Sequence, residues 1–217
     1  PDLDTLVTNE TLLGRFDVQD ISSEALLFQA GYLTIRDIQE LVRGKHLYSL
    51  TYPNLEVQIS LNEALLPALG LAGDVALLNG VKLLGALREA DLPALHTHLK
   101  ALFAAIPHDW HRKNPIAQYE GYYASVFYSH FAALGLSVTV EEASRQGRVD
   151  MVLAHAGQVY LFEFKTVADE AEGQALRQIV ERGYADKYRG RGDAVHLIGV
   201  EFSRSQRQVV GFETQTL

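Results

Sequence analysis

The sequence contains no cysteine. Disulfide bonds and thiolate metal sites are therefore excluded, and any metal ion must be bound by oxygen atoms or by imidazole. The lack of cysteine also fits a reducing compartment, so we expect a cytoplasmic protein.

Long apolar runs are missing as well. No stretch of about 18 uninterrupted apolar residues occurs, and no basic segment precedes an apolar one in the manner of a secretory signal. We therefore expect no membrane partner. The phosphate-binding pattern G-x-x-x-x-G-K-[ST] is also absent, so these 217 residues do not hold the nucleotide-binding part of an ATPase. Because Pro1 takes the place of an initiator methionine, we expect a part of something longer.

Basic residues are fewer than acidic ones. The chain has 19 Lys and Arg against 27 Asp and Glu, which gives a net charge of −8. Neutralising the phosphates of a nucleic acid requires clustered Lys and Arg. The net negative charge therefore argues against a protein that binds nucleic acid by overall electrostatic attraction. The excess of acid lies mainly in the first hundred residues, and the remainder is close to neutral.

Residues 1–70 have the pattern of a small module. A helix is predicted over Ala25–Ala30, followed by strands over Tyr32–Ile35 and His46–Tyr52. Apolar residues at helical spacing predict another helix over Leu55–Leu69. This order indicates a helical, winged-helix-like module. Such a module suggests DNA binding, but its few basic residues leave a packing or regulatory role open.

The rest of the chain predicts two connecting helices within residues 71–113 and an α/β domain over residues 114–217. The connecting helices are expected at Asp74–Leu87 and Leu92–Ile106. The α/β domain is expected to contain, in order, a helix from Asn114, a strand over Ser137–Val140, a hairpin over Gly147–Lys165, a helix over Ala168–Arg182, and strands over His196–Phe202 and Gln208–Phe212. A helix between two strands favours a parallel crossover, so the predicted fold is a mixed central sheet flanked by helices.

The hairpin carries the strongest chemical signal. If Ala156-Gly157 is its two-residue loop, Asp150 lies opposite Glu163, and alternation of side chains places Lys165 on the same face. Two carboxylates so close require a shared proton or a bound cation. A hard divalent ion such as magnesium or manganese would satisfy both. The alternative is a cross-strand salt bridge.

This pattern, D-x12-E-F-K on a hairpin, resembles the PD-(D/E)XK nuclease superfamily. Within it, Leu161–Lys165 and Gln178–Tyr188 are similar to segments of the nuclease domain found at the C-terminus of bacterial AAA-ATPase-like proteins. The resemblance implies a restriction-endonuclease-like core, cleavage of nucleic acid with DNA favoured, and an ATPase portion upstream, with residues 1–70 as its tail. A catalytically silent nuclease-like domain for DNA binding or assembly is the alternative.

The resemblance also implies site roles. A metal would be held by Asp150, Glu163 and the Phe164 carbonyl. Glu120 would either bind this metal directly or contact one of the groups that bind it. Lys165 would position or deprotonate the attacking water.

Residues outside the hairpin complete the predicted site. Gln178 would orient the lysine or the substrate, as the resemblance implies. Lys187, Arg189 and Arg191 could contact phosphates, although a basic loop is usually only solvated. Glu120 lies on an apolar helix face, where it could instead be a buried structural acid.

Overall fold

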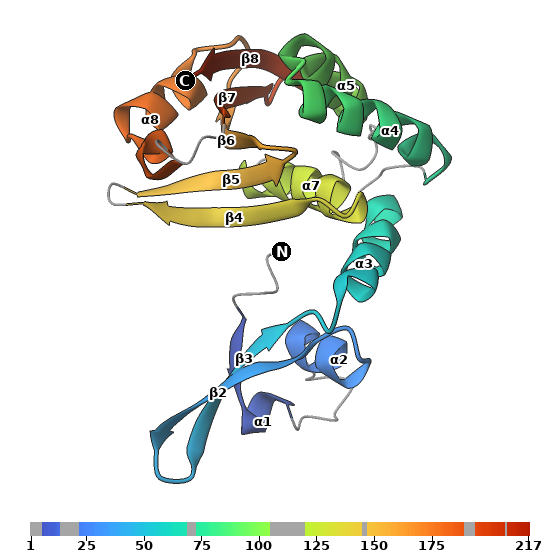
Figure 1. Ribbon diagram of the computed structural model, residues 1–217, viewed down its shortest axis with the longest axis vertical. Coiled ribbons are helices and arrows are strands. Elements are labelled where there is room, and N and C mark those ends of the chain that lie inside the picture. The colour runs from blue at the N-terminus through green and yellow to red at the C-terminus, as the bar shows by residue number, and fades with distance from the viewer. Residues whose placement is uncertain are drawn as a thin grey trace. The chain divides into compact units, whose positions relative to one another are not determined.

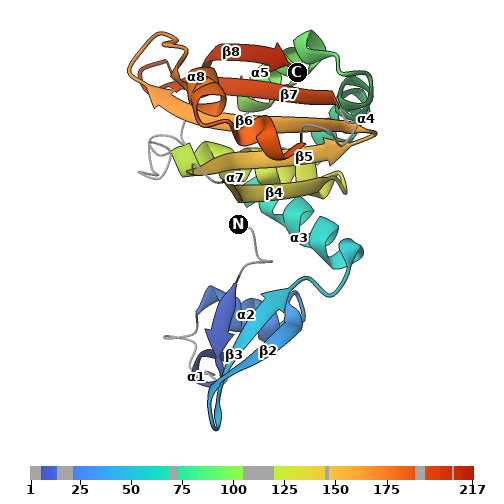
Figure 2. The same cartoon turned by 60° about the vertical axis from the view of Figure 1, so that its left-hand side comes forward.

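The computed structural model describes residues 6–13, 22–68, 73–104, 120–144, 147–188, 194–206 and 208–217. The chain divides into two compact units, residues 1–62 and 63–217, and the division falls inside helix α3 (Leu55–Ala68). Each unit has its own sheet (Figures 1 and 2). Within the described ranges, no helix has the length and apolar character needed to cross a membrane.

The first unit is built on a three-stranded antiparallel sheet with the strand order β1-β3-β2. The Ser22 hydroxyl caps the second helix by accepting a hydrogen bond from the Ala25 N–H at 3.2 Å. The predicted helix and both predicted strands are present, and the winged-helix interpretation stays a prediction. The elements are β1 (Val7–Asn9), α1 (Glu10–Leu13), α2 (Ser23–Gln29), β2 (Thr34–Val42) and β3 (Lys45–Thr51).

Strand β2 is longer than the sequence indicated. It continues to Val42, whereas the predicted strand ended at Ile35. Its residues are almost all exposed, and it is an edge strand of its sheet, beside β3. A strand with so little burial lacks the apolar alternation that reveals strands in a sequence, so the predicted end was wrong.

The second unit contains a five-stranded sheet with the strand order β4-β5-β6-β7-β8. Neighbouring strands are antiparallel except for β6 and β7, which are parallel as predicted. Helix α8 (Gln174–Glu181) lies between those two strands in the chain and forms the crossover. The strands are β4 (Ser137–Ser144), β5 (Gly147–His155), β6 (Gln158–Val167), β7 (Ala194–Ser203) and β8 (Gln208–Thr216).

Helices cover both faces of this sheet (Figure 2). One face packs against helices α4 (Gly73–Glu89), α5 (Leu92–Ala104) and α7 (Glu120–Ala133). The segments expected as connecting helices, α4 and α5, thus contribute to the core of the second unit. The buried residues of this layer include Leu83, Leu87, Leu95, Leu99, Phe103, Phe127, Phe131, Phe162, Phe164 and Val200.

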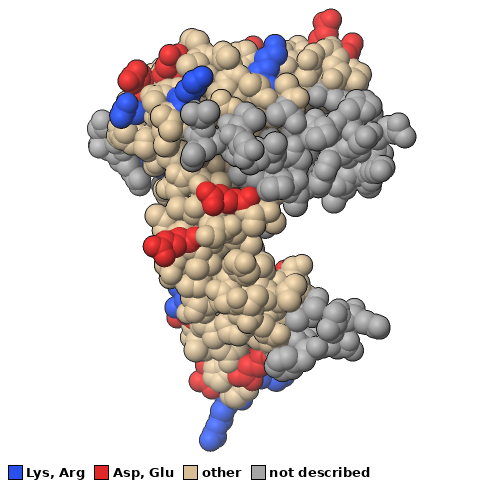
Figure 3. Space-filling model, turned by 90° about the vertical axis from the view of Figure 1, so that its right-hand side faces the viewer, with Lys and Arg blue, Asp and Glu red and all other residues tan. Residues whose placement is uncertain are grey.

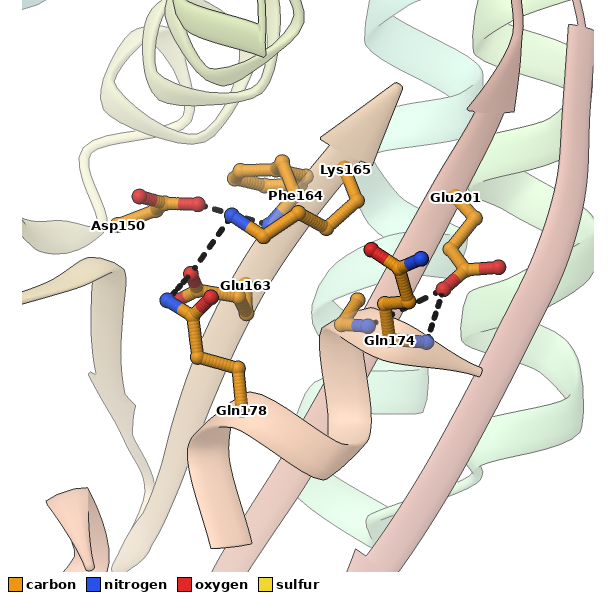
Figure 4. A network of polar contacts seen from close by, with 8 residues as sticks. Asp150, Glu163, Phe164, Lys165, Gln174, Gln178 and Glu201 are labelled. Atoms are coloured by element: carbon orange, nitrogen blue, oxygen red, sulfur yellow. Dashed lines mark hydrogen bonds and ion pairs between the residues drawn. The ribbon is translucent and has the colours of Figure 1, made fainter. Parts of the chain in front are cut away.

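The other face packs against α8 and the 3₁₀ helix η3 (Tyr184–Tyr188). Side chains alternate along β6, so Phe162 and Phe164 enter the first core while Glu163 and Lys165 point toward α8 (Figure 4). Glu163 and Lys165, which the sequence predicted to share one face of the hairpin, therefore lie under α8.

Helix α8 begins at Gln174, so its predicted start at Ala168 was wrong. The backbone of Ala168 instead accepts a hydrogen bond from the Ser205 N–H at 3.2 Å, and Gly173 has a left-handed φ of 67°. Contacts with the β7–β8 connection hold this segment as a loop, although its composition suits a helix.

Candidate functional site

The β5–β6 hairpin places the first two acidic residues. Its turn residues, Ala156 and Gly157, have φ values of 51° and 77°, which suit a two-residue hairpin loop. The strands pair in the predicted register from His155↔Gln158 to Met151↔Phe162.

Asp150 follows this paired stretch on β5, and its side chain contacts the backbone of Phe164 on β6. Its Oδ2 accepts a hydrogen bond from the backbone N–H of Phe164 at 2.8 Å. This bond fixes the Asp150 carboxylate beside Glu163.

Glu163 is the centre of the site (Figure 4). Its side chain is only 1% exposed. Oε1 accepts hydrogen bonds from Lys165 Nζ, at 3.2 Å, and from Gln178 Nε2. Oε2 is buried and has no hydrogen-bond partner among the described residues. One oxygen thus accepts two hydrogen bonds, while the other remains available to a ligand.

Burial and the nearby charge of Asp150 raise the pKa of Glu163 to about 7. The Lys165 ammonium and the backbone N–H of Asp150 oppose this rise in pKa without cancelling it. Glu163 can therefore carry a proton near neutral pH unless a cation neutralises its charge.

Gln178 reaches Glu163 from α8. Its predicted role, to orient the lysine or the substrate, stays a prediction. Lys187 lies on η3, with its Nζ 5.2 Å from the centroid of the Tyr188 ring. Arg189 and Arg191 lie outside the described residues, as does the side chain of Glu120, whose backbone begins α7.

Sequence reasoning missed Glu201. This buried residue of β7 lies opposite Lys165 in the parallel register, and its carboxylate accepts hydrogen bonds from backbone N–H groups at the start of α8. The sequence did contain a signal for it, since Glu201 is an acid inside the apolar run His196–Phe202. A carboxylate buried in such a strand needs hydrogen-bond partners, which would have indicated a structural or functional role.

Basic side chains do not form one continuous patch among the described residues on the face shown in Figure 3. That face is the one turned away from α8. Close to the site itself, Lys165 pairs with Glu163, and Lys187 lies on η3.

The donor set fits a hard divalent cation. Asp150 and Glu163 provide two neighbouring carboxylates, and Glu163 Oε2 lacks a partner in the described structure. A third acidic or histidine ligand does not join them within the described ranges. Carbonyl oxygens and water would then complete the coordination, as is usual for magnesium.

The chain is similar to known proteins in two respects. The whole chain is 54% identical over 217 residues to a protein of Azotobacter chroococcum mcd 1 named "Uncharacterized protein in vnfD 5'region". The chain covers 42% of that relative's length, so it corresponds to part of a longer protein. The narrower resemblance to domains linked to AAA-ATPases stays a prediction. Residues 118–212, which include the hairpin and Gln178, match the PD-(D/E)XK nuclease superfamily.

Proposed function

We propose that this chain is a metal-dependent phosphodiesterase that cleaves nucleic acid, with DNA as the first candidate. We propose further that it forms the nuclease part of a longer, ATPase-linked protein. The observation that carries the proposal is the convergence of Asp150, Lys165 and Gln178 on Glu163. One carboxylate oxygen of Glu163, Oε2, is buried and lacks a partner among the described residues. The superfamily match of residues 118–212 supports the same reaction class.

The two carboxylates and the Phe164 carbonyl would hold a magnesium or manganese ion. The bound ion would supply a water of lowered pKa and neutralise charge on a phosphate oxygen. Asp150 is held in place for this task by the Phe164 N–H. Gln178 donates to Oε1 of Glu163, and Oε2, which has no hydrogen-bond partner among the described residues, would be the oxygen that binds the ion.

Lys165 would act on the attacking water or on the phosphate. Its Nζ pairs with the buried Glu163 at 3.2 Å, and 20% of its side chain is exposed. Its Nζ would hold the attacking water in line with the phosphorus atom, or stabilise the negative charge that develops on the phosphate oxygens. Lys187, with Arg189 and Arg191, would contact the phosphates of the substrate.

The direct test is a cleavage panel of single-stranded DNA, duplex DNA and RNA with magnesium or manganese. Lys165→Ala should lower turnover by roughly 10²- to 10⁴-fold, the usual range for a positioned proton-transfer group. Lys82→Ala, which removes an exposed lysine of α4, is the matched control and should cleave like the wild type.

Two results would count against the proposal. Equal turnover by Lys165→Ala and wild type would show that the hairpin does not perform the cleavage. No cleavage of any substrate by the wild type would favour the alternative of a silent DNA-binding or assembly module.

A further inference from the structure

Glu201 makes an unusual set of contacts for a buried acid. It is 2% exposed. Oε2 accepts hydrogen bonds from the N–H groups of Glu172, at 2.5 Å, and Gly173, at 3.0 Å. Oε1 accepts from Gln174, at 2.5 Å, and Ala175, at 3.1 Å. Four consecutive backbone donors thus converge on one carboxylate (Figure 4 shows its contact with the start of α8).

These donors explain why the acid stays charged. Burial by itself raises the pKa of Glu201, but the four N–H groups outweigh that effect and hold the pKa below its ordinary value. Two of them belong to the first residues of α8, where backbone N–H groups have no partner within the helix. A negative charge at this end also interacts favourably with the helix dipole. The carboxylate therefore fixes the loop and the helix start together.

A second contact fixes the same helix against the sheet. Gly199 lies two residues before Glu201 on β7 and pairs in register with Glu163. A Cβ atom at Gly199 would lie 2.3 Å from the backbone N of Leu176. The backbone of α8 thus rests directly on β7, beside the strand that carries Glu163.

Gln178 lies one helical turn after Gln174, whose N–H Glu201 binds. The position of its side-chain amide relative to Glu163 is therefore set by where α8 begins. We propose that Glu201 is a positioning residue that holds α8 so that Gln178 can orient the Glu163 carboxylate. This inference rests on the proposed nuclease function, because it assigns Glu201 a role in that site.

A spectroscopic experiment tests the positioning without any need for activity. In the full 217-residue chain labelled with ¹⁵N, the side-chain amide signal of Gln178 can be assigned by its absence in Gln178→Ala. Glu201→Gln should move this signal toward that of solvent-exposed glutamines and speed its hydrogen exchange by roughly 10-fold, the factor that corresponds to losing about one hydrogen bond.

The matched control is Glu213→Gln. Glu213 is an exposed acid of β8 whose carboxylate lies 3.1 Å from the place where a Cβ of Gly173 would be, so it adjoins the same loop. Its neutralisation should leave the Gln178 signal unchanged. If Glu201→Gln does not fold, Glu201→Asp keeps the charge but shortens the reach, and the same shift of the signal is expected. An unchanged Gln178 signal in the folded Glu201 variant would overturn the inference.

Turnover gives the second measurement. Gln178→Ala and Glu201→Gln should each lower it by roughly 10- to 100-fold, since a misplacement of about 1 Å can cost 10²-fold. If Glu201 acts through Gln178, the double variant should be no slower than Gln178→Ala alone, whereas losses that multiply would overturn the inference. A wild type that cleaves nothing would refute the proposed function, and the Gln178 signal would still test the positioning.

Discussion

Lys165 and Glu201 lie opposite each other on the parallel strands β6 and β7, yet their charged groups have different partners. Lys165 Nζ pairs with Glu163 on its own strand, at 3.2 Å. Glu201 instead receives backbone N–H groups from the start of α8. The ammonium group therefore belongs to the site on the hairpin, and the buried carboxylate belongs to the scaffold that carries Gln178.

Metal binding should stabilise the fold through Asp150 and Glu163. Magnesium or manganese at about ten times its Kd should raise the free energy of unfolding by about 1.4 kcal/mol, because the ion binds only the folded state. The melting temperature of the wild type should rise accordingly. Asp150→Asn and Glu163→Gln should lose this response, because each removes one of the two acids.

Glu213→Gln is the control for that experiment, since it removes an exposed acid outside the proposed metal site. It should retain the full metal-dependent rise in melting temperature. An equal rise in Glu163→Gln would show that the ion binds elsewhere.

The hairpin was predictable from the sequence because its information is local. A two-residue turn fixes the register, and the register brings Asp150 close to Glu163. The crossover helix after β6 was also predicted, and Gln178 lies on it. The choice of Gln178 as a site residue came from the resemblance to the nuclease superfamily and not from the helix pattern. The role of Glu201 was not predictable in the same way, because it depends on which loop folds back over β7.

The start of α8 shows the same limit. Propensity allowed a helix from Ala168, but contacts with the distant β7–β8 connection hold that segment as a loop. The local pattern specified the β5–β6 turn and its register, whereas the exposed end of β2 and the start of α8, which long-range hydrogen bonds set, leave little trace in the sequence.

Nucleic-acid binding should depend on salt through the predicted basic loop. Replacing Lys187, Arg189 and Arg191 with Ala should reduce the slope of log K against log salt by about one unit for each phosphate group that the variant no longer neutralises. Filter binding or anisotropy at several salt concentrations measures that slope.

A triple variant at Lys82, Arg88 and Lys100 removes the same charge from exposed positions of α4 and α5. Its slope should equal that of the wild type. If the two triple variants show the same slope, the binding surface lies away from the loop.

Acid should destabilise the second unit through the buried His130 and its partner His98. Nε2 of His98 and Nε2 of His130 lie 3.0 Å apart, so one ring donates to the other and only one of these two nitrogens carries a proton. Burial and the neighbouring His98 lower the pKa of His130 to about 4. The unfolded chain binds this proton near pH 6.5, so stability present above that pH is lost as the pH falls toward 4.

The loss should approach about 1.4 kcal/mol per pH unit for this one group. His130→Leu should make the free energy of unfolding less dependent on pH between 6.5 and 4, as measured by urea denaturation. Measurements at about pH 8, where both histidines are neutral, separate the packing cost of the substitution from the protonation effect. An unchanged pH slope in His130→Leu would contradict the prediction.

Gly199→Ala should test how closely α8 rests on the sheet. A Cβ at this position would meet the Leu176 backbone, which cannot rotate away as a flexible side chain could. We expect a loss of roughly 1–3 kcal/mol in the free energy of unfolding, as for other overpacked sites. Gly85→Ala is the control, because it lies in α4 with open space around its Cβ and should stabilise that helix by up to about 1 kcal/mol. Equal stability of Gly199→Ala and wild type in urea denaturation would mean that α8 can lift from β7 without cost, and the helix could then not hold Gln178 in a fixed place.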